Sequence, residues 1–288
     1  MISRVDIQSH THSLPGLPAS VAQLIGMLGD ERASISDFEG VIRMDPGLSV
    51  NLLRLANSSW FGLPREVVSV KQAVGLLGTR RLLEIATGAG FRQILPDWIP
   101  GYGMTAEGFW LHSVAVAMLA ERIAERLRLE LPDLTFTAGL LHDIGKLVVA
   151  SVFEGREALF RGELLAGSDS VTAERTLFGI EHAEAGAELA DAWGLPERLL
   201  APIRHHHHGL EHSTETEQRL VDLIHTADAL ACVLGFSDAV GALARTVDSA
   251  VVERLGLRVQ DLEGVACEAL EPIQEMASRM CGASGGAP

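Results

Sequence analysis

Apolar side chains recur at helical spacing along most of this chain. Val21, Leu24, Ile25 and Leu28 occupy positions i, i+3, i+4 and i+7, the pattern of one buried helix face. Longer amphipathic stretches follow over residues 106–129, 133–152, 171–178, 181–192, 196–208, 215–234, 238–255 and 259–281. No stretch alternates with the period of a strand, so the pattern predicts an all-α fold, a multi-helix bundle with further helices at the C-terminus.

Polar residues mark where several of these helices should begin. Ser36 with Glu39 three residues later predicts a capping box. Asp45 before a proline predicts a cap followed by the first helical position. Ser69 predicts the start of a further helix, which Gly78 is expected to end.

A short segment divides the chain into two helical halves. Residues 96–104 hold two prolines and two glycines and predict a linker. We therefore expect a lead-in, an N-terminal helical half, a second helical half and a set of accessory helices packed on the second half, over residues 1–13, 14–95, 105–210 and 211–288 respectively.

Composition and charge argue against several classes of protein. The chain contains no apolar run of the roughly 20 residues that a membrane helix needs, and its N-terminus lacks the pattern of a signal peptide. Its three cysteines show no CxxC spacing and predict reduced thiols, as in the cytoplasm. Residues 1–100 carry nine basic and nine acidic residues, so the net charge of −15 arises from residues 101–288. An acidic surface of this kind argues against nucleic acid as a partner.

The strongest chemical signal is the string Leu-His-Asp-Ile-Gly-Lys at residues 141–146. His142 and Asp143 offer an imidazole and a carboxylate to one point, a donor set that suits Zn, Fe or Mn. A metal held there could lower the pKa of bound water and create a nucleophile at neutral pH. Lys146 is one of only two lysines in the chain, so the composition does not favour a lysine in this string.

The motifs, taken in order, resemble the HDOD (HD-related output domain) family. The matching strings are Leu14-Pro15-Gly16-Leu17-Pro18, Asp45-Pro46, Leu55-Ala56-Asn57-Ser58, Gln72-Ala73, Leu77-Gly78, Phe109-Trp110, His112-Ser113, Gly139 to Lys146, Glu174, Gly179, His182, Trp193 to Pro196 and the histidine run 205–208. The resemblance covers residues 14–210. It implies an all-helical protein of bacterial signal transduction, working with sensor, receiver or cyclase-type partners, in a family where many members have lost metal ligands.

A more catalytic relative, the HD-GYP phosphodiesterase, has a similar order of metal ligands. The resemblance implies a site for one or two ions of Fe, Mn or Zn, made by His112, His142, Asp143, His182, His206, His207 and Asp228. Lys146 matches the lysine of the related motif and could bind a phosphate or stabilise developing charge. The Gly-Tyr-Pro segment after the paired histidines is absent, because residues 208–212 read His-Gly-Leu-Glu-His and the only tyrosine is Tyr102. Hydrolysis of cyclic di-GMP is therefore not expected.

Three functions remain open on these residues. The first is a regulatory or interaction module that keeps an HD-type metal site. The second is a metal-dependent phosphohydrolase acting on a phosphate ester or nucleotide, and the third is a helical scaffold without metal.

Single candidate ligands also have a structural interpretation. His112 or His182 alone would indicate a core histidine, and the helix could turn Asp228 outward. If Asp228 is a ligand, residues 211–288 must fold back onto the second half. Four consecutive histidines on a helix cannot all face one site. The resemblance, through the family spacing after Ile203, implies that His206 and His207 are the inner pair, so we expect His205 and His208 to face solvent.

Overall fold

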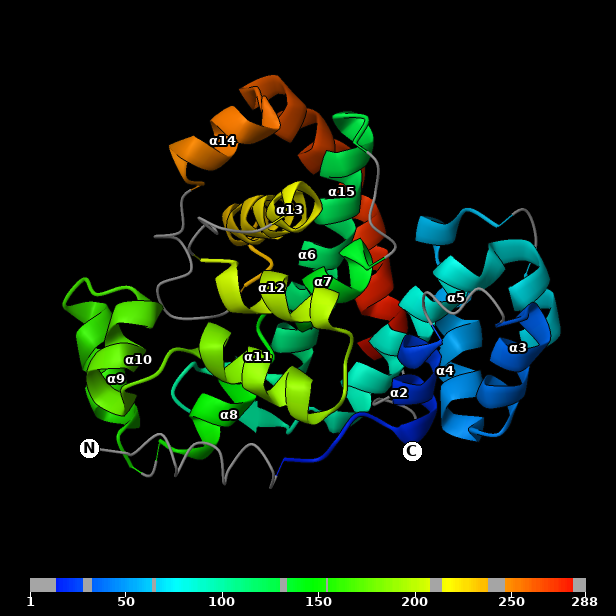
Figure 1. The fold of residues 1–288 in the computed structure, drawn as a ribbon, viewed down its shortest axis with the longest axis horizontal. Coiled ribbons are helices and arrows are strands. Elements are labelled where there is room, and N and C mark those ends of the chain that lie inside the picture. Colours follow the sequence, from blue (N-terminus) through cyan, green and yellow to red (C-terminus); the bar gives the residue numbers. More distant parts are fainter. Residues whose placement is uncertain are drawn as a thin grey trace. The chain divides into compact units, whose positions relative to one another are not determined.

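The structure, a computed structural model, describes residues 14–27, 33–63, 66–129, 134–153, 155–207, 214–237 and 247–281. Leu28, His208 and the positions of the missing Gly-Tyr-Pro segment lie outside these residues, as does the start of the predicted stretch 238–255. The described chain is helical apart from one small hairpin, which confirms the all-α prediction (Figure 1). None of its helices combines the length and apolar character needed to cross a bilayer.

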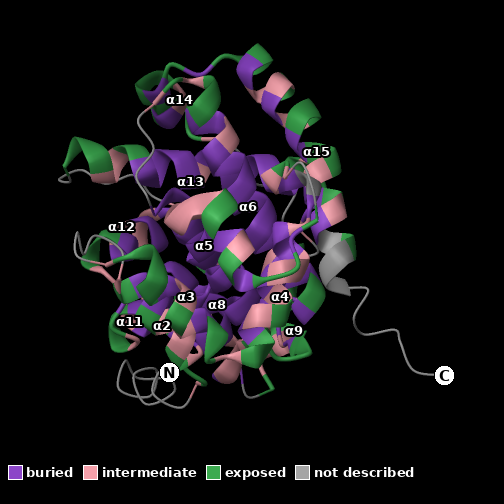
Figure 2. Ribbon diagram, turned by 90° about the vertical axis from the view of Figure 1, so that its right-hand side faces the viewer, coloured by how far each residue is buried: buried purple, intermediate pink, exposed green. Residues whose placement is uncertain are grey.

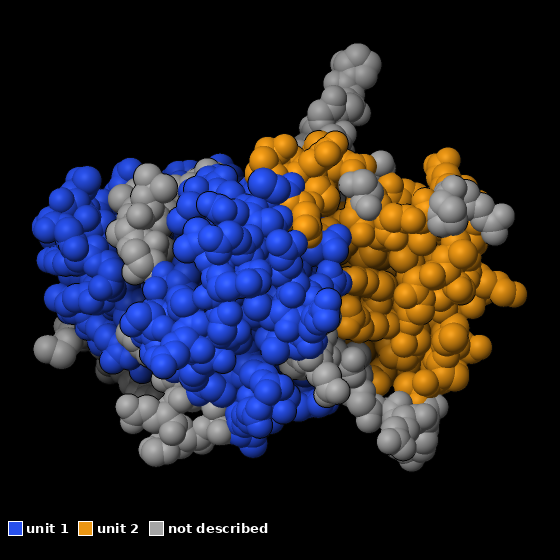
Figure 3. All heavy atoms as spheres, turned by 90° about the horizontal axis from the view of Figure 1, so that it is seen from above, with its two compact units in different colours: residues 1–15, 96–267 blue, residues 16–95, 268–288 orange. Residues whose placement is uncertain are grey.

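The chain divides into two compact units (Figure 3). Unit 1 comprises residues 1–15 and 96–267, and unit 2 comprises residues 16–95 and 268–288. The division within the chain at Pro96 lies at the start of the segment predicted as a linker. The last helix, α15 (Val259–Cys281), contributes residues to both units.

Unit 2 is built by helices whose apolar faces pack on one long helix. Its elements are α2 (Ala19–Gly26), α3 (Ile35–Arg43), α4 (Pro46–Ala56), the 3-10 turn η1 (Ser59–Phe61) and α5 (Val70–Ile94). The predicted cap at Asp45 is confirmed, because its side chain accepts a hydrogen bond from the Leu48 amide at 2.9 Å. Ser69 caps α5 as predicted, and Gly78 interrupts that helix with φ +73°.

The capping box predicted at Ser36 and Glu39 is wrong by two residues. The box is formed by Ser34 and Asp37, with the Ser34 amide donating to the Asp37 carboxylate at 2.8 Å. Ser34 has the extended backbone that a cap requires, whereas Ser36 already lies inside α3.

Unit 1 holds the elements that meet around the histidines. These are β1 (Trp98–Ile99), β2 (Met104–Thr105), α6 (Ala106–Arg126), α7 (Thr135–Leu141), α8 (Gly145–Ser151), α9 (Glu157–Leu165), α10 (Ser170–Phe178), α11 (His182–Ala192), α12 (Glu197–His205), α13 (Glu215–Val233) and α14 (Ser249–Leu255). The long helices α6 and α13 pack on each other and are buried along most of their length (Figure 2).

Part of the predicted linker is an antiparallel hairpin, an element that the sequence pattern did not predict. Trp98 pairs with Thr105 and Ile99 with Met104. Strands of two residues are too short to show alternation. The turn contains Gly101 and Gly103 at positive φ, and the side chain of Thr105 then caps α6.

The helix predicted over residues 133–152 is broken at the chemical motif. Between α7 and α8, the amides of Ile144, Lys146 and Leu147 bond to carbonyls three residues earlier instead of four. This tightening is typical of a 3-10 turn. It places Asp143 between two short helices, so that its side chain does not follow the face of a continuous helix.

The start of α8 touches α11 backbone to backbone. A Cβ added at Gly145 would overlap the carbonyl oxygen of His182 and the backbone nitrogen of Gly186. Backbone atoms cannot move aside without shifting a helix, so this position admits only glycine.

We therefore expect Gly145→Ala to lower the free energy of unfolding by about 1–3 kcal/mol or more, through overpacking. Gly162→Ala is the matched control, because Gly162 is exposed within α9 and its added Cβ meets nothing within 4 Å. That change should raise stability by about 0.5–1 kcal/mol. Urea unfolding of both variants measures the difference, and equal stabilities would contradict the close contact of α8 and α11.

Candidate metal centre

Five structural elements bring seven histidine and aspartate side chains to one place in unit 1. Each residue named as a candidate ligand from the sequence lies there: His112 on α6, His142 and Asp143 at the α7–α8 turn, His182 at the start of α11, His206 and His207 at the end of α12, and Asp228 on α13. The side chains gather although 116 positions separate the first from the last in the chain (228 − 112).

The ligand atoms form two groups. Cluster 1 consists of Asp143, His182, His206 and His207, and cluster 2 consists of His112, His142 and Asp228. Within each cluster, one nitrogen or oxygen from every side chain lies within 4.8 Å of all the others. Both clusters therefore have the dimensions of a site for a single ion.

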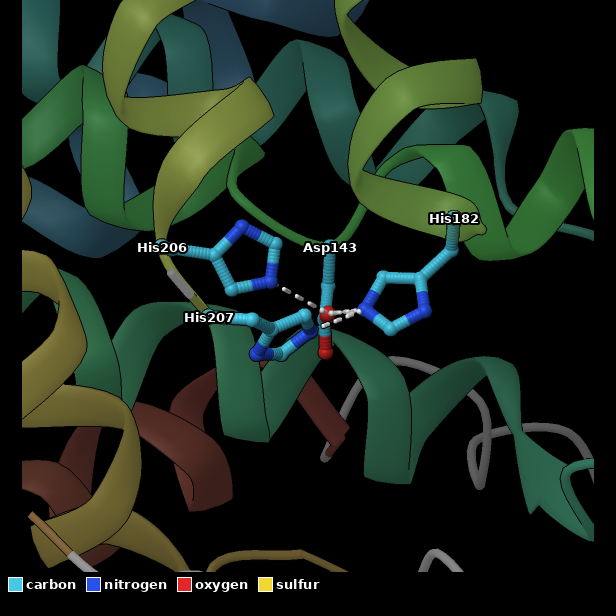
Figure 4. A group of neighbouring side chains, drawn as sticks. All are labelled: Asp143, His182, His206 and His207. Carbon is cyan, nitrogen blue, oxygen red and sulfur yellow. Dashed lines mark hydrogen bonds and ion pairs between the residues drawn. The ribbon is translucent and has the colours of Figure 1, made fainter. Parts of the chain in front are cut away.

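The carboxylate of Asp143 lies between the two clusters. Its Oδ1 atom is 3.2 Å from His182 Nε2 and 3.6 Å from His206 Nε2 (Figure 4). Its Oδ2 atom is 3.4 Å from Nε2 of both His112 and His142. One carboxylate thus presents a separate oxygen to each group of imidazoles, the arrangement of a residue that bridges two cations.

The remaining members close each cluster from the opposite side. Asp228 Oδ1 lies 3.2 Å from His112 Nε2 and 3.8 Å from His142 Nε2. In cluster 1, the Nε2 atoms of His207 and His182 are 2.6 Å apart. Figure 4 shows the three imidazoles of cluster 1 directed at Asp143 from α11 and the end of α12.

The outer nitrogens of three histidines are held by hydrogen bonds. His142 Nδ1 donates to the Gly139 carbonyl at 2.7 Å, and His206 Nδ1 donates to the Ile203 carbonyl at 2.8 Å. Each acceptor lies three residues earlier, on the turn of helix that precedes the ring. A proton on Nδ1 leaves the Nε2 lone pair free to bind a metal, so these bonds set the tautomer that ligation needs.

The third of these histidines, His182, is held by a buried carboxylate. Glu174 on α10 accepts hydrogen bonds from His182 Nδ1 at 2.7 Å and from the His182 amide, also at 2.7 Å. The hydroxyl of Tyr102, in the hairpin turn, donates to Glu174 at 2.8 Å. Burial, followed by the neighbouring Glu174 charge, raises the pKa of Tyr102 well above its usual value, so the hydroxyl keeps its proton.

The site is nearly closed to solvent. Asp143 is 0% exposed, and of the seven side chains only His207 is more than slightly accessible. Burial would raise the pKa of Asp143, but Lys146 and the adjacent His142 hold it well below its usual range. Burial lowers the pKa of His206 to about 3, so this ring is neutral at pH 7 and can bind a metal.

Lys146 pairs directly with the bridging carboxylate. Its Nζ atom lies 2.5 Å from Asp143 Oδ2, one turn further along the chain, and the side chain is buried. The ammonium therefore offsets the carboxylate charge in the described site. A phosphate oxygen would have to compete with Asp143 for this ammonium.

The buried atoms fit a divalent metal. His142 Nε2, His206 Nε2 and Asp143 Oδ1 are buried and make no hydrogen bond. Such atoms cost free energy unless a partner binds them. All three point into the clusters and carry the donor types that Zn, Fe and Mn accept. A cation in each cluster would supply the missing partners.

The sequence motifs identify the inner side chains but not those that support them. Tyr102 stands outside every motif, and Glu174 carries no signal beyond its place in the family pattern, eight residues before His182. Neither position reveals that the two side chains bond to each other. His205, predicted to face solvent, is half-buried and belongs to neither cluster.

Comparisons with known proteins identify a family and related structures. Residues 14–209 match the HDOD domain family. An HDOD domain protein with unknown function from Geobacter sulfurreducens is 26% identical, with a TM-score of 0.75 over 96% of each chain. A protein from Shewanella amazonensis SB2B, provisionally described as a phosphohydrolase, is also 26% identical, with a TM-score of 0.74 over 95% of this chain and 97% of that one.

One curated relative is longer than this chain. An uncharacterized protein from Treponema pallidum (strain Nichols) is 26% identical over an alignment of 237 residues, and the match covers 76% of this chain. The match spans only 42% of that relative's length.

The bond between Tyr102 and Glu174 predicts a measurable contribution to stability. We expect Tyr102→Phe to lower the free energy of unfolding by about 1–3 kcal/mol, because a buried carboxylate loses a donor. Tyr102→Leu should cost more, since it also removes the edge contacts of the ring with Phe153 and Phe160. Urea unfolding distinguishes them, and a Tyr102→Phe variant as stable as the wild type would show that the bond contributes nothing.

Proposed function

The chain belongs to the HDOD family, and from this premise we propose that it is a regulatory module of signal transduction that keeps a two-metal HD-type centre. The ligands would be Asp143, His182, His206 and His207 for one ion, and His112, His142, Asp228 and the shared Asp143 for the other. The preferred ions are Fe, Mn and Zn, because the donors are imidazole and carboxylate.

The position of Asp143 carries this proposal. A helical scaffold without metal would gain nothing from placing one buried carboxylate between two sets of Nε2 atoms. It would also leave the buried atoms of His142, His206 and Asp143 without partners. Divalent ions held by the two clusters would offset the charge of Asp143 and supply partners for the buried nitrogens of His142 and His206. The metal-free scaffold is therefore the weakest of the three functions.

A regulatory role is favoured over efficient catalysis by the way the site is enclosed. Six of the seven proposed ligands are buried, and Lys146 is engaged with Asp143. The sequence also lacks the Gly-Tyr-Pro segment, and its acidic second half would repel an anionic dinucleotide. We propose signalling proteins of the bacterial cytoplasm as its partners.

The accessory helices would then be part of the centre. Asp228 lies on α13, beyond the residues that match the family, yet its carboxylate reaches His112. We propose that the part of residues 211–288 that belongs to unit 1, up to residue 267, acts with the second helical half rather than as a separable domain.

A metal-dependent phosphohydrolase is the second candidate, favoured by the complete set of ligands and by Lys146. A bound divalent ion would lower the pKa of water to give a nucleophile and polarise a phosphoryl oxygen. Of the residues of this chain, Lys146 would hold the phosphate after leaving Asp143. Glu174 would keep the His182 ring oriented and its Nδ1 protonated.

Elemental analysis of protein purified without chelator or nickel resin tests the centre. We expect about two equivalents of transition metal per chain, as in two-metal sites. Asp143→Ala should reduce this to below about one equivalent, because both ions lose the bridge. Replacing His142 and Asp143 together should abolish binding. His205→Ala, in the same histidine run but outside both clusters, should keep the wild-type content. A wild type well below one equivalent would refute the metal centre.

The choice between module and enzyme rests on turnover. We expect no efficient hydrolysis across a panel of cyclic dinucleotides, nucleotides and an aryl phosphate, assayed with Mn, Fe(II) and Zn. Slow cleavage of a simple ester is compatible with the site. Turnover of a cyclic dinucleotide near about 1 per second, at the low end of ordinary enzyme rates, and lost in His142→Ala, would make the protein an enzyme.

A further inference from the structure

His225 lies beside the proposed centre without belonging to either cluster. It is half-buried on α13, three residues before Asp228, so the two side chains share a face of the helix. Asp228 faces cluster 2, whereas the His225 ring reaches the backbone at the end of α12. The sequence motifs give this histidine no role.

The His225 ring makes one hydrogen bond to each of two distant segments. Its Nδ1 atom lies 2.8 Å from the carbonyl oxygen of His206, and the amide of Asp248 lies 3.0 Å from its Nε2 atom. A carbonyl accepts and an amide donates, so the ring is the neutral tautomer with its proton on Nδ1. Both nitrogens are therefore used in the described structure.

The His206 carbonyl is a sensitive place for such a bond. Helix α12 ends at His205, and His206 is its C-cap, so this oxygen is one that the helix leaves without an internal partner. The same peptide plane joins His206 to His207. Fixing its orientation fixes the point from which the His207 ring extends toward His182.

From these contacts we infer that His225 is a positioning residue for the His206–His207 pair. This inference rests on the proposed metal centre, because the pair supplies two ligands of cluster 1. His206 is held at its ring by Ile203 and at its carbonyl by His225. His207 has the most exposed ring of the cluster, so its position depends most on the backbone that carries it.

Through Asp248, the N-cap of α14, His225 also links α13 to α14. A second contact between these two helices allows this link to be tested apart from the bond to His206. Arg254 on α14 makes two hydrogen bonds to the buried carboxylate of Asp222 on α13, at 2.8 and 2.6 Å. This contact joins α13 and α14 but does not involve His206. Arg254→Ala therefore tests the docking of α14 alone.

Metal affinity gives the first readout on the full chain, using chelator competition with Co(II) and its visible spectrum. We expect His225→Ala to weaken binding about 10–100-fold, as loss of a supporting bond does at other metal sites. His225→Asn keeps a donor near the Nδ1 position and should restore affinity to within about threefold, with the wild-type spectrum. Arg254→Ala should bind as the wild type does. Equal loss in Arg254→Ala, or no loss in His225→Ala, would overturn the inference.

An NMR experiment on metal-free protein tests this inference independently of the proposed function. In metal-free protein, ring proton–nitrogen correlations should show the Nδ1-protonated tautomer of His225. The His206 carbonyl carbon and His207 amide resonances should shift in His225→Ala and return toward wild type in His225→Asn. If the wild type binds no metal, the proposed function fails while these shifts still decide the role of His225. Unchanged resonances in His225→Ala would refute it.

Discussion

The structure of unit 1 depends on one buried carboxylate. Asp143 has no exposed surface, and an ionised group so placed is tolerated only when charges and donors surround it. Lys146 comes from the same turn, and the imidazoles of clusters 1 and 2 come from α6, α7, α11 and α12. The packing of these helices and the ionisation of Asp143 therefore support each other. The break between α7 and α8 and the glycine contact with α11 allow the carboxylate to reach that point.

The inner site could be predicted from the sequence because its chemistry is carried by residue type and order. A His-Asp pair flanked by separated histidines is typical of a metal site, and each of those side chains lies in a cluster. The supporting residues could not be predicted in the same way. Periodicity does not indicate that Tyr102 and Glu174 lie together beside His182. His225 bonds to the carbonyl of His206, which is available because α12 ends at His205.

In the fold, too, elements with a long repeating apolar face could be predicted, whereas elements set by local geometry could not. Long helices such as α6 and α13 were predicted because their apolar faces repeat over many turns. The hairpin at Trp98–Thr105 was missed because two residues cannot show alternation, and α9 because it buries only Phe160. The shift of the capping box from Ser36 to Ser34 reflects two serines with equal capping chemistry, between which only the backbone conformation decides.

The enclosure of the two clusters has a consequence for how such a centre would be filled. With six of the seven ligands buried, an ion cannot be exchanged at the surface, and it must enter while the polypeptide folds or during local opening near His207. The rate of exchange would then be set by the frequency of that opening as well as by the strength of the metal–ligand bonds. The filling and emptying of such a centre would therefore report how often the segment that carries His207 opens.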